Sequence, residues 1–395
     1  MCKGKDLYQF LDLGYHPHSD QFRNTNDEPE MHYPLRVLMC KNCNLAQLAH
    51  VVDAHDLYQK DYLYEASITQ TASMHWFDFA EDVIAVTGIK KGKVLDIGSN
   101  DGSLLMKFKF RSFDVLGVDP CFEVGEIARN RHKVPTITDF YPSEKIQDKF
   151  NLITGTNVFA HVDDLDAFME GIVKNLGEKG VFVFESPYLL SFLEGLEYDT
   201  VYHQHLSYLS LKPVMSFVRK FGLEVFDAKR TGLHGGGFRV YICRKGEREI
   251  NHQALVKLLE AESAHDEQDL WSFENEVTLH RAKFAKAVAD LYNSGKTIAC
   301  VSAPAKGMTL LNATGVGQFI SFVTEKSLLK IGRYTPGTKI KIYGDDELLE
   351  RQPDVAIILA WNFAEEIMRN NPDFEGTWLI PLPTLVTINP TSEYP

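Results

Sequence analysis

The stretch Val94-Leu-Asp-Ile-Gly-Ser-Asn-Asp-Gly102 decides the fold of this chain, because it joins an apolar strand to a glycine-bearing turn. Residues 93–97 predict a buried strand, and a helix is predicted to open at Ser103. The glycines let the backbone approach a ligand closely, and a helix N-terminus offers free N–H groups. About twenty residues further on, Val115-Leu-Gly-Val-Asp119 ends a second predicted strand in an acid, as in nucleotide-binding α/β sheets.

Two cofactors fit this layout, a dinucleotide and S-adenosylmethionine. In both cases Asp119 is placed to accept the hydroxyl groups of a ribose. A dinucleotide turn has the pattern G-x-G-x-x-G, whereas this turn is G-S-N-D-G and follows Asp96 within the strand. Carboxylates there repel a pyrophosphate but suit the cationic methionine end of S-adenosylmethionine. We therefore predict an S-adenosylmethionine site formed by Asp96, Gly98, Asn100, Gly102 and Asp119.

The composition narrows the class of protein. The chain has 395 residues, a formal net charge of −13, 44% hydrophobic residues and 24% charged residues. This mixture supports folded cores, and its acidic balance argues against a protein that coats nucleic acid. No apolar run approaches the roughly 18 residues of a membrane span, and the N-terminus lacks the apolar core of a signal peptide. We expect a cytoplasmic monomer that binds neither nucleic acid nor a membrane.

Strand-like runs alternate with helical stretches in two parts of the chain. The first set is 93–97, 114–118, 151–154, 181–185 and 237–243, and the second is 297–302, 319–324, 339–343, 355–359 and 378–381. Strands separated by helices predict mostly parallel sheets. Between the two sets, apolar residues recur at three- and four-residue steps from Leu270 to Leu291, which predicts a long amphipathic helix. We expect three units: 1–60, 61–250 and 251–395.

Several motifs together resemble one enzyme family. They are LDIGSNDGSLL, GVDP, NVFAHVDDL, VFESPY, YHQHLSY, HGGGFRV, APAKGMTLLN, GRYTPGTKI and LAWNFAEEI. The chain resembles the sugar-nucleotide C-methyltransferases that modify dTDP-linked 4-keto deoxysugars, over nearly its whole length. The resemblance implies a small Cys-rich zinc-binding N-terminal module, a central Rossmann-like S-adenosylmethionine methyltransferase domain and a C-terminal Rossmann-like α/β domain. It also implies that Pro120 and Asn157 join the cofactor site and that S-adenosylhomocysteine is a product.

Four histidines lie at predicted strand ends or beside glycine turns, namely His161, His203, His205 and His234. Methylating carbon requires a base that removes a proton next to a carbonyl group, and histidine suits that task. Tyrosine hydroxyls or a second histidine can hold the enolate oxygen. The resemblance implies that His205 is the base and that Tyr202 and His161 line the reacting sugar. It also implies substrate contacts from Tyr62, Tyr64, His203, Gln204 and His234.

We predict methyl transfer to C3 of a nucleotide-linked 4-keto-6-deoxy sugar, with a dTDP-sugar favoured over a GDP-sugar. Two residues depart from the resemblance: Gln204 stands where the family has Glu, and Gly237 where it tends to have Ser. Two alternatives stay open, methyl transfer to a sugar hydroxyl and a sugar-nucleotide-binding protein that lost turnover through Gln204. A dinucleotide-linked oxidoreductase is a more distant alternative.

Three cysteines cluster near the N-terminus, Cys2 and the CxxC knuckle of Cys40 and Cys43. Paired knuckles typically close a tetrahedral zinc site whose metal supplies folding energy. The resemblance implies two CxxC pairs, with Cys2 aligned to the second cysteine of the first pair. We predict structural zinc over a redox-active CxxC, which needs a thioredoxin-like context. Three outcomes stay open: a trimmed N-terminus, no metal, or a fourth ligand from His16, His18 or His32.

The remaining cysteines and one basic turn complete the sequence-based predictions. Cys121, Cys243 and Cys300 are predicted to be buried small apolar residues. Ser302-Ala-Pro-Ala-Lys306-Gly lies between a predicted strand and helix, as a phosphate-cradling turn does. GxxxxGK[ST] is absent, which excludes an NTP-hydrolysing loop. The resemblance favours Lys306 and Arg333 as contacts of the sugar nucleotide, and the alternative is a structural turn with Lys306 in solvent.

Overall fold

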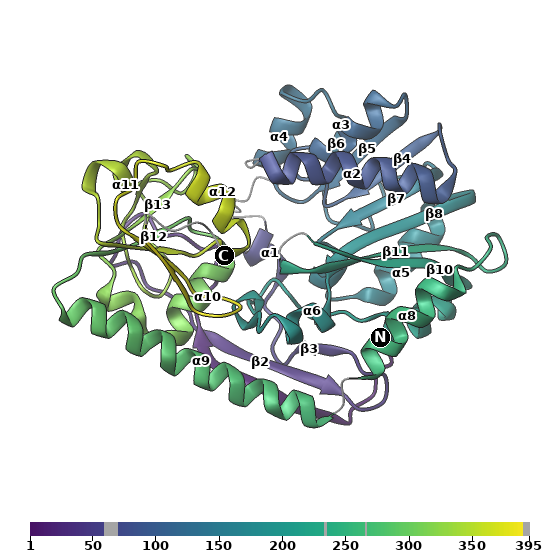
Figure 1. Ribbon diagram of the computed structural model, residues 1–395. Coiled ribbons are helices and arrows are strands. Elements are labelled where there is room, and N and C mark those ends of the chain that lie inside the picture. The colour runs from purple at the N-terminus through teal and green to yellow at the C-terminus, as the bar shows by residue number, and fades with distance from the viewer. Residues whose placement is uncertain (59–69, 233–234, 265–266, 390–395) are drawn as a thin grey trace.

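The computed structural model describes residues 1–58, 70–232, 235–264 and 267–389. Three sheets organise this part of the chain (Figure 1). The two larger sheets lie in separate lobes, and the N-terminal strands run beneath both of them. The predicted α/β fold class is therefore confirmed.

The N-terminal module is an antiparallel sheet in the order β1-β2-β3-β9. Its strands are β1 (Leu7–His16), β2 (Tyr33–Cys40), β3 (Ala46–Leu48) and β9 (Ser207–Tyr208). Ala46 pairs with Tyr208, so the last strand of this sheet comes from the His-rich segment of the central region, residues 198–208, which carries His203 and His205. This pairing ties the His-rich segment to the N-terminal module.

The central sheet has seven strands in the order β10-β11-β8-β7-β4-β5-β6. The five strands from β6 to β8 are parallel, and β11 pairs antiparallel with both β8 and β10. The strands are β4 (Lys93–Ile97), β5 (Asp114–Asp119), β6 (Thr136–Thr138), β7 (Phe150–Thr156), β8 (Leu176–Pro187), β10 (Leu223–Thr231) and β11 (Gly237–Arg244). Its helices are α2 (Gln70–Thr87), α3 (Ser103–Phe110), α4 (Phe122–Asn130), α5 (Leu165–Asn175), α6 (Leu189–Glu194), α7 (Leu211–Val218) and α8 (His252–Ser263), and α1 (Ala54–Tyr58) precedes them.

The long helix α9 (Glu267–Asn293) joins the lobes along the lower edge of the molecule (Figure 1). Its predicted apolar stripe is confirmed, since Phe273, Val277 and Phe284 are buried. Phe273 packs on Phe10 of β1 with ring centroids 6.3 Å apart. The helix therefore holds the N-terminal module against the C-terminal lobe.

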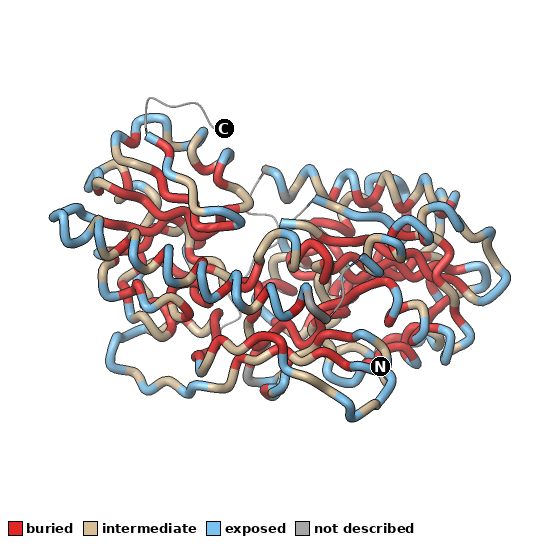
Figure 2. The backbone as a smooth tube through the Cα atoms, turned by 60° about the horizontal axis from the view of Figure 1, so that its bottom comes forward, coloured by how far each residue is buried: buried red, intermediate tan, exposed pale blue. Residues whose placement is uncertain are grey.

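The C-terminal sheet has the order β14-β13-β12-β15-β16-β17, parallel except for β17. Its strands are β12 (Ile298–Val301), β13 (Phe322–Glu325), β14 (Ile342–Gly344), β15 (Val355–Ile358), β16 (Thr377–Ile380) and β17 (Val386–Ile388). Its helices are α10 (Ala305–Thr314), α11 (Asp346–Arg351) and α12 (Ala364–Arg369). Figure 2 shows burial concentrated on the strands, with exposed residues on the outward helix faces. Within the described residues, no helix combines the length and apolar character that crossing a membrane requires.

Several strands lie outside the predicted set. β1 and β2 lie in the N-terminal region, for which no strand is predicted, and β10 is also absent from the predicted strand-like runs. β13 begins at Phe322 rather than at 319, because residues Val316–Phe319 form a 3₁₀ turn. β1 pairs with β2 and β10 pairs with β11, each the next strand along the chain, so these strands are stabilised by antiparallel neighbours rather than by a strong pattern of their own.

Candidate active site

A cavity of about 540 Å³ extends from the carboxyl end of the central sheet to the carboxyl end of the C-terminal sheet. This volume is in the range of sites for cofactors and small substrates. Most of the predicted site residues in the described part of the chain line it, together with residues that sequence reasoning missed. Tyr62, Tyr64 and His234 lie outside the described residues.

The glycine turn after β4 approaches its surroundings too closely for a side chain. Gly98 has φ +66° and donates its N–H to the Val118 carbonyl at 2.8 Å. A Cβ at this position would lie 2.3 Å from Val158 Cγ2. Gly102, at φ +79°, is the N-cap residue that directly precedes α3. Both positions therefore favour glycine; Gly98 lines the cavity, whereas Gly102, which was predicted to contact the cofactor, does not.

Asp119 ends β5 and is held by two backbone donors. Its Oδ2 accepts from the Asn100 N–H at 2.9 Å, and its Oδ1 accepts from the Cys121 N–H at 2.9 Å. Burial raises the pKa of Asp119 to about 6, although the two N–H groups favour the ionised form. Asp119 and Pro120 line the cavity. The carboxylate is thus preorganised where a ribose would bind.

The other predicted cofactor residues surround the same part of the cavity. Burial raises the pKa of Asp96 to about 7, and its Oδ1 accepts the Thr154 hydroxyl at 2.6 Å. Asn157, at φ +56°, donates its N–H to the Glu185 carbonyl at 2.7 Å. Ser99 Oγ is buried and has no hydrogen-bond partner among the described residues. The glycine turn at Gly98 and the strand-end acid Asp119, which both line the cavity, together fit S-adenosylmethionine.

His205, Tyr202 and His161 come together in the cavity. The Nδ1 of His205 lies 2.8 Å from the Thr200 carbonyl oxygen, which accepts a hydrogen bond and so places the ring proton on Nδ1. The lone pair of Nε2 then faces the Tyr202 hydroxyl, which donates to it at 2.7 Å. The His161 ring lies 5.0 Å from the His205 ring, centroid to centroid.

Burial keeps both histidines neutral. It lowers the pKa of His205 to about 4, although the bond to Thr200 works in the opposite direction. It also lowers the pKa of His161 well below its usual value, and the nearby His205 adds to this shift. A neutral imidazole with its Nε2 lone pair in the cavity can accept a proton.

Gln204 contacts a residue from the N-terminal module. Its Nε2 donates to Oδ2 of Asp20 at 3.2 Å, and both side chains line the cavity. Sequence reasoning missed Asp20, which lies in the connection between β1 and β2. No local signal marks it, because it reaches the cavity only through the packing of the N-terminal module against the C-terminal lobe.

His203 points away from the cavity, unlike its neighbours. It is fully buried and does not line the cavity. Its ring packs edge-on against His18 at 5.3 Å and Tyr33 at 5.8 Å. His203 lies in a turn that the His205 N–H closes by donating to the Tyr202 carbonyl at 2.9 Å, and this turn directs its side chain away from the cavity. His203 was predicted to contact the substrate, but its side chain does not reach the cavity.

Lys306 is placed at the cavity but inside a charged cluster. Its Nζ hydrogen-bonds Asn362 Oδ1 and lies 4.0 Å above the Trp361 ring. Burial lowers the pKa of Lys306, while the charges of Asp199 and Glu197, at the start of the His-rich segment and directly before it, favour the charged form. The predicted alternative of a Lys306 in solvent therefore has no support. Asp199 in turn accepts from Trp361 Nε1 at 2.7 Å.

Arg333 lies apart from Lys306 and does not line the cavity. Its guanidinium donates to the Phe22 carbonyl at 3.4 Å. A residue that sequence reasoning missed, Glu325 at the end of β13, does line the cavity. The sequence pattern that predicts Asp119 could also have identified Glu325. Each is an acid at the end of the strand that comes second along the chain in its sheet.

Glu325 repeats the arrangement of Asp119 in the second lobe. Its Oε2 accepts from the Ala303 N–H at 2.8 Å, in the turn after the first strand of the sheet. Its Oε1 accepts from the Ser327 N–H at 3.1 Å, two residues further along the chain. Ser327 Oγ is buried in the cavity wall without a hydrogen-bond partner among the described residues. This corner of the cavity can hold a second hydroxyl-rich group.

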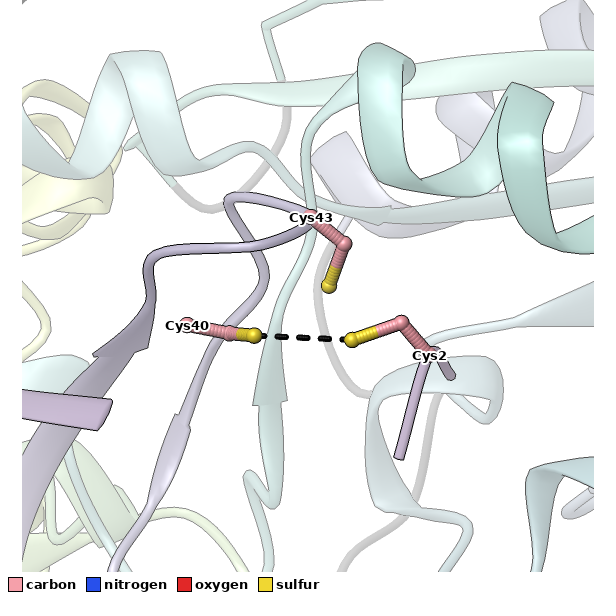
Figure 3. Close-up of side chains that lie close together, drawn as sticks. All are labelled: Cys2, Cys40 and Cys43. Carbon is pink, nitrogen blue, oxygen red and sulfur yellow. Dashed lines mark hydrogen bonds between the residues drawn. The ribbon is translucent and has the colours of Figure 1, made fainter. Parts of the chain in front are cut away.

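The three N-terminal cysteines form a separate site. Sγ atoms of Cys2, Cys40 and Cys43 all lie within 4.8 Å of one another and point toward a common centre (Figure 3). The Sγ atoms of Cys2 and Cys40 are 3.5 Å apart. A set of three soft thiolates suits zinc, which takes four ligands in structural sites. Among the described residues no histidine belongs to this group, so His16, His18 and His32 do not supply the fourth ligand there.

The other three cysteines are buried, as predicted. Cys121, Cys243 and Cys300 are each at most 1% exposed. Burial raises the pKa of the Cys121 and Cys243 thiols to about 11. They are therefore neutral apolar side chains in the core.

Three family models match consecutive parts of the chain. Residues 1–58 match the "Putative zinc binding domain" model, residues 74–228 match a methyltransferase domain model, and residues 232–383 match the C-methyltransferase C-terminal domain model. The C-methyltransferase NovU of Streptomyces niveus is 29% identical over 398 residues, which cover 97% of this chain and 94% of that protein.

Two solved methyltransferases are similar to part of the chain. An S-adenosylmethionine-dependent methyltransferase of Clostridium acetobutylicum is 16% identical and has a TM-score of 0.37, covering 46% of this chain and 94% of its own. The glycopeptide N-methyltransferase MtfA, complexed with S-adenosyl-L-methionine, is 13% identical with a TM-score of 0.37, covering 46% of this chain and 96% of its own.

Proposed function

We propose that this S-adenosylmethionine-dependent C-methyltransferase, whose N-terminal cysteine cluster fits zinc, methylates C3 of a nucleotide-linked 4-keto-6-deoxy sugar. We divide it into an N-terminal module (1–60), a cofactor domain (61–250) and a C-terminal domain (251–395). The observation that supports the proposal most strongly is the hydrogen-bonded pair of Tyr202 and His205 in the cavity between the last two.

The Tyr202–His205 pair can remove a proton from carbon. Because Nδ1 of His205 donates to Thr200, its Nε2 accepts the incoming proton. The Tyr202 hydroxyl occupies this lone pair at 2.7 Å, so a proton can pass through it. Tyr202 takes the proton from C3 as it gives its own to Nε2. The products are an enolate of the 4-keto sugar, an intact phenol and an imidazolium.

A carbon acid needs its enolate oxygen held by donors in a water-poor pocket. His161 lies beside His205 and is neutral because burial lowers its pKa, so its ring can act as a donor without adding a positive charge. It ends the 3₁₀ turn Phe159–His161 that follows β7, and its N–H donates to the Val158 carbonyl at 2.8 Å, which fixes its backbone. We assign to His161 the contact with the 4-keto oxygen.

The cofactor end of the cavity supplies orientation. Asp119 would hold the ribose hydroxyls, and the turn at Gly98 would admit the methionine portion beside Asp96 and Ser99. S-adenosylmethionine supplies an electrophilic methyl group and leaves as S-adenosylhomocysteine. The protein then has to keep the enolate carbon facing this end of the cavity and exclude water.

The nucleotide end of the substrate fits the C-terminal lobe. Glu325 is held there by the Ala303 and Ser327 N–H groups as Asp119 is held in the cofactor domain, and it can accept the hydroxyl of a deoxyribose or ribose. Lys306 lies in the same cavity, where it offers positive charge to a diphosphate. We propose a dTDP-sugar as substrate, with a GDP-sugar as the alternative to be tested.

The test is proton exchange and methyl transfer on a panel of dTDP-, GDP- and UDP-linked 4-keto-6-deoxy sugars. We expect the wild type to exchange the C3 proton in deuterated water and to form a C-methylated product by mass spectrometry. His205→Gln should lower exchange by about 10²- to 10⁴-fold. His252→Gln, at an exposed position on α8, is the matched control and should leave the rate unchanged.

Three results would contradict the proposal. Retained exchange in His205→Gln would exclude this residue as the base. A methyl ether as product would show transfer to a hydroxyl. Binding of the sugar nucleotide without turnover in the wild type would show a binding protein.

A further inference from the structure

The segment around Asp20 belongs to the N-terminal module but is held by the C-terminal lobe. Ser19 Oγ lies 3.2 Å from Thr309 Oγ1 on α10. Arg23 and Tyr334 exchange backbone hydrogen bonds, with N–O distances of 3.0 and 2.8 Å. Contacts on both sides of Asp20 therefore hold its backbone in place at the cavity wall.

The Asp20 side chain faces the cavity and meets Gln204. Its Oδ2 accepts the Gln204 amide N–H at 3.2 Å, and Gln204 is only 2% exposed. Burial raises the pKa of Asp20, and the charge of Lys330 opposes this shift. Lys330 is itself buried, donates to the Ala303 carbonyl at 2.8 Å and lies 4.7 Å from the Phe22 ring centre. The carboxyl thus stands among fixed partners rather than in bulk water.

In the pair, Gln204 is the hydrogen-bond donor and Asp20 is the acceptor. An amide cannot ionise, so any negative charge of the pair comes from Asp20. Because Asp20 takes one N–H of Gln204, the amide is held in one rotamer, directly before His205 in the chain. The Asp20 carboxylate oxygens therefore lie at the cavity wall beside an amide of fixed orientation. A ligand with hydroxyl or amino groups can donate hydrogen bonds to them there.

We propose that Asp20 and Gln204 act as one carboxylate–amide unit that contacts the sugar, so that the N-terminal module supplies a specificity-determining residue to the active site. This inference rests on the proposed function, since it takes the ligand of this part of the cavity to be a sugar. The unit accepts a hydrogen bond from a hydroxyl or an amino group on the sugar ring. What the site requires is one negative charge on the pair, whichever of the two positions holds it.

A charge exchange between the two positions tests this idea. Asp20→Asn leaves the pair without charge, Gln204→Glu gives it two carboxylates, and the double variant restores one of each. We expect each single change to lower kcat/KM for a dTDP-4-keto-6-deoxyhexose by roughly ten- to a hundredfold, mainly through KM. The double variant should return to within about threefold of the wild type.

The matched control is Asp12→Asn in the same module. Asp12 pairs with Arg36 at 2.8 Å on β1, does not line the cavity, and should leave kcat/KM unchanged. Unfolding midpoints and S-adenosylhomocysteine affinity of all variants show whether a loss is only structural. Single variants with wild-type kinetics, or a double variant whose losses multiply, would overturn the proposal. So would losses that follow the unfolding midpoint alone.

The wild type separates this inference from the proposed function. If it makes a methyl ether, C3 chemistry fails, and the charge exchange is scored on the rate of ether formation. If it binds the dTDP-sugar without turnover, the four proteins are compared by their dissociation constants in calorimetry. In each case recovery in the double variant supports the unit, and its absence refutes the unit.

Discussion

Replacing Lys306 by Met tests the charged cluster that joins the two lobes at the cavity. The change removes a cation whose Nζ lies 4.0 Å above the Trp361 ring and which offsets the charges of Asp199 and Glu197. Both acids are buried, Asp199 completely and Glu197 to 3% exposure. The variant therefore has two buried carboxyl groups that have lost their neighbouring cation.

The size of the effect follows from the charge that is left. Lys306 acts on the two acids through space, so its removal should cost up to about 3 kcal/mol of unfolding free energy, less than the roughly 3–5 kcal/mol for breaking a buried contact ion pair. Burial and Asp199 raise the pKa of Glu197 to about 8, and Lys306 opposes this rise. The folded state therefore binds the Glu197 proton more tightly than the unfolded state, so this group stabilises the fold at low pH and loses that effect as the pH rises through about 8.

Without Lys306 the pKa values of the acids rise further, and the folded variant holds more protons than the wild type at alkaline pH. The loss of unfolding free energy in Lys306→Met, relative to the wild type, is then largest near pH 8. It becomes smaller as the pH falls, by up to about 1.4 kcal/mol per pH unit. The assay is urea unfolding of both proteins at several pH values between 6 and 8.5. Adding Asp199→Asn to the variant should recover part of the loss.

The matched control is Lys326→Met, which removes a lysine at the edge of the same cavity. Lys326 is 46% exposed, and its Nζ lies 3.9 Å from Asp345, so the change should cost less than about 1 kcal/mol. A Lys306→Met variant as mild as this control at pH 8, or a penalty that does not depend on pH, would refute the reasoning. Unchanged affinity for dTDP in Lys306→Met would show separately that Lys306 does not contact the diphosphate.

Four further predictions concern the cofactor, the glycine turn, the metal and the pH profile. Asp119→Ala should weaken S-adenosylhomocysteine binding in calorimetry by roughly ten- to a hundredfold, while Asp114→Ala at the exposed start of the same strand leaves it unchanged. Gly98→Ala should lower the unfolding free energy by about 1–3 kcal/mol, because its Cβ meets Val158 Cγ2, and Val158→Ala should restore part of it; no recovery would contradict that contact. The purified protein should hold zinc by elemental analysis, lose it in Cys43→Ala but not in Cys243→Ala, and unfold at lower temperature when a chelator removes the metal. Since the pKa of His205 is lowered to about 4, its neutral form persists above that value, and kcat/KM of the wild type should show no acid limb from His205 between pH 6 and 8.

The sequence by itself determined the parts of this protein that rest on local pattern. The apolar run, glycine turn and strand-end acid from residue 94 to Asp119 predicted the sheet and the cofactor layout, because turn geometry and strand order are properties of short segments. The apolar stripe of α9 and the CxxC knuckle were likewise visible as spacings. The association of His205, Tyr202 and His161 was implied by the family resemblance, and in the structure they line one cavity.

Only the tertiary structure decided which side chains meet across the lobes. Asp20 reaches Gln204, and Asp199 reaches Trp361, over separations of 184 and 162 residues. His203 packs on His18 of the N-terminal module, although its neighbours in the chain line the cavity. The Arg333 guanidinium donates a hydrogen bond to the Phe22 carbonyl of that module. These outcomes depend on how three sheets pack and on which polar groups burial forces to pair, and neither is encoded in the pattern of any one segment.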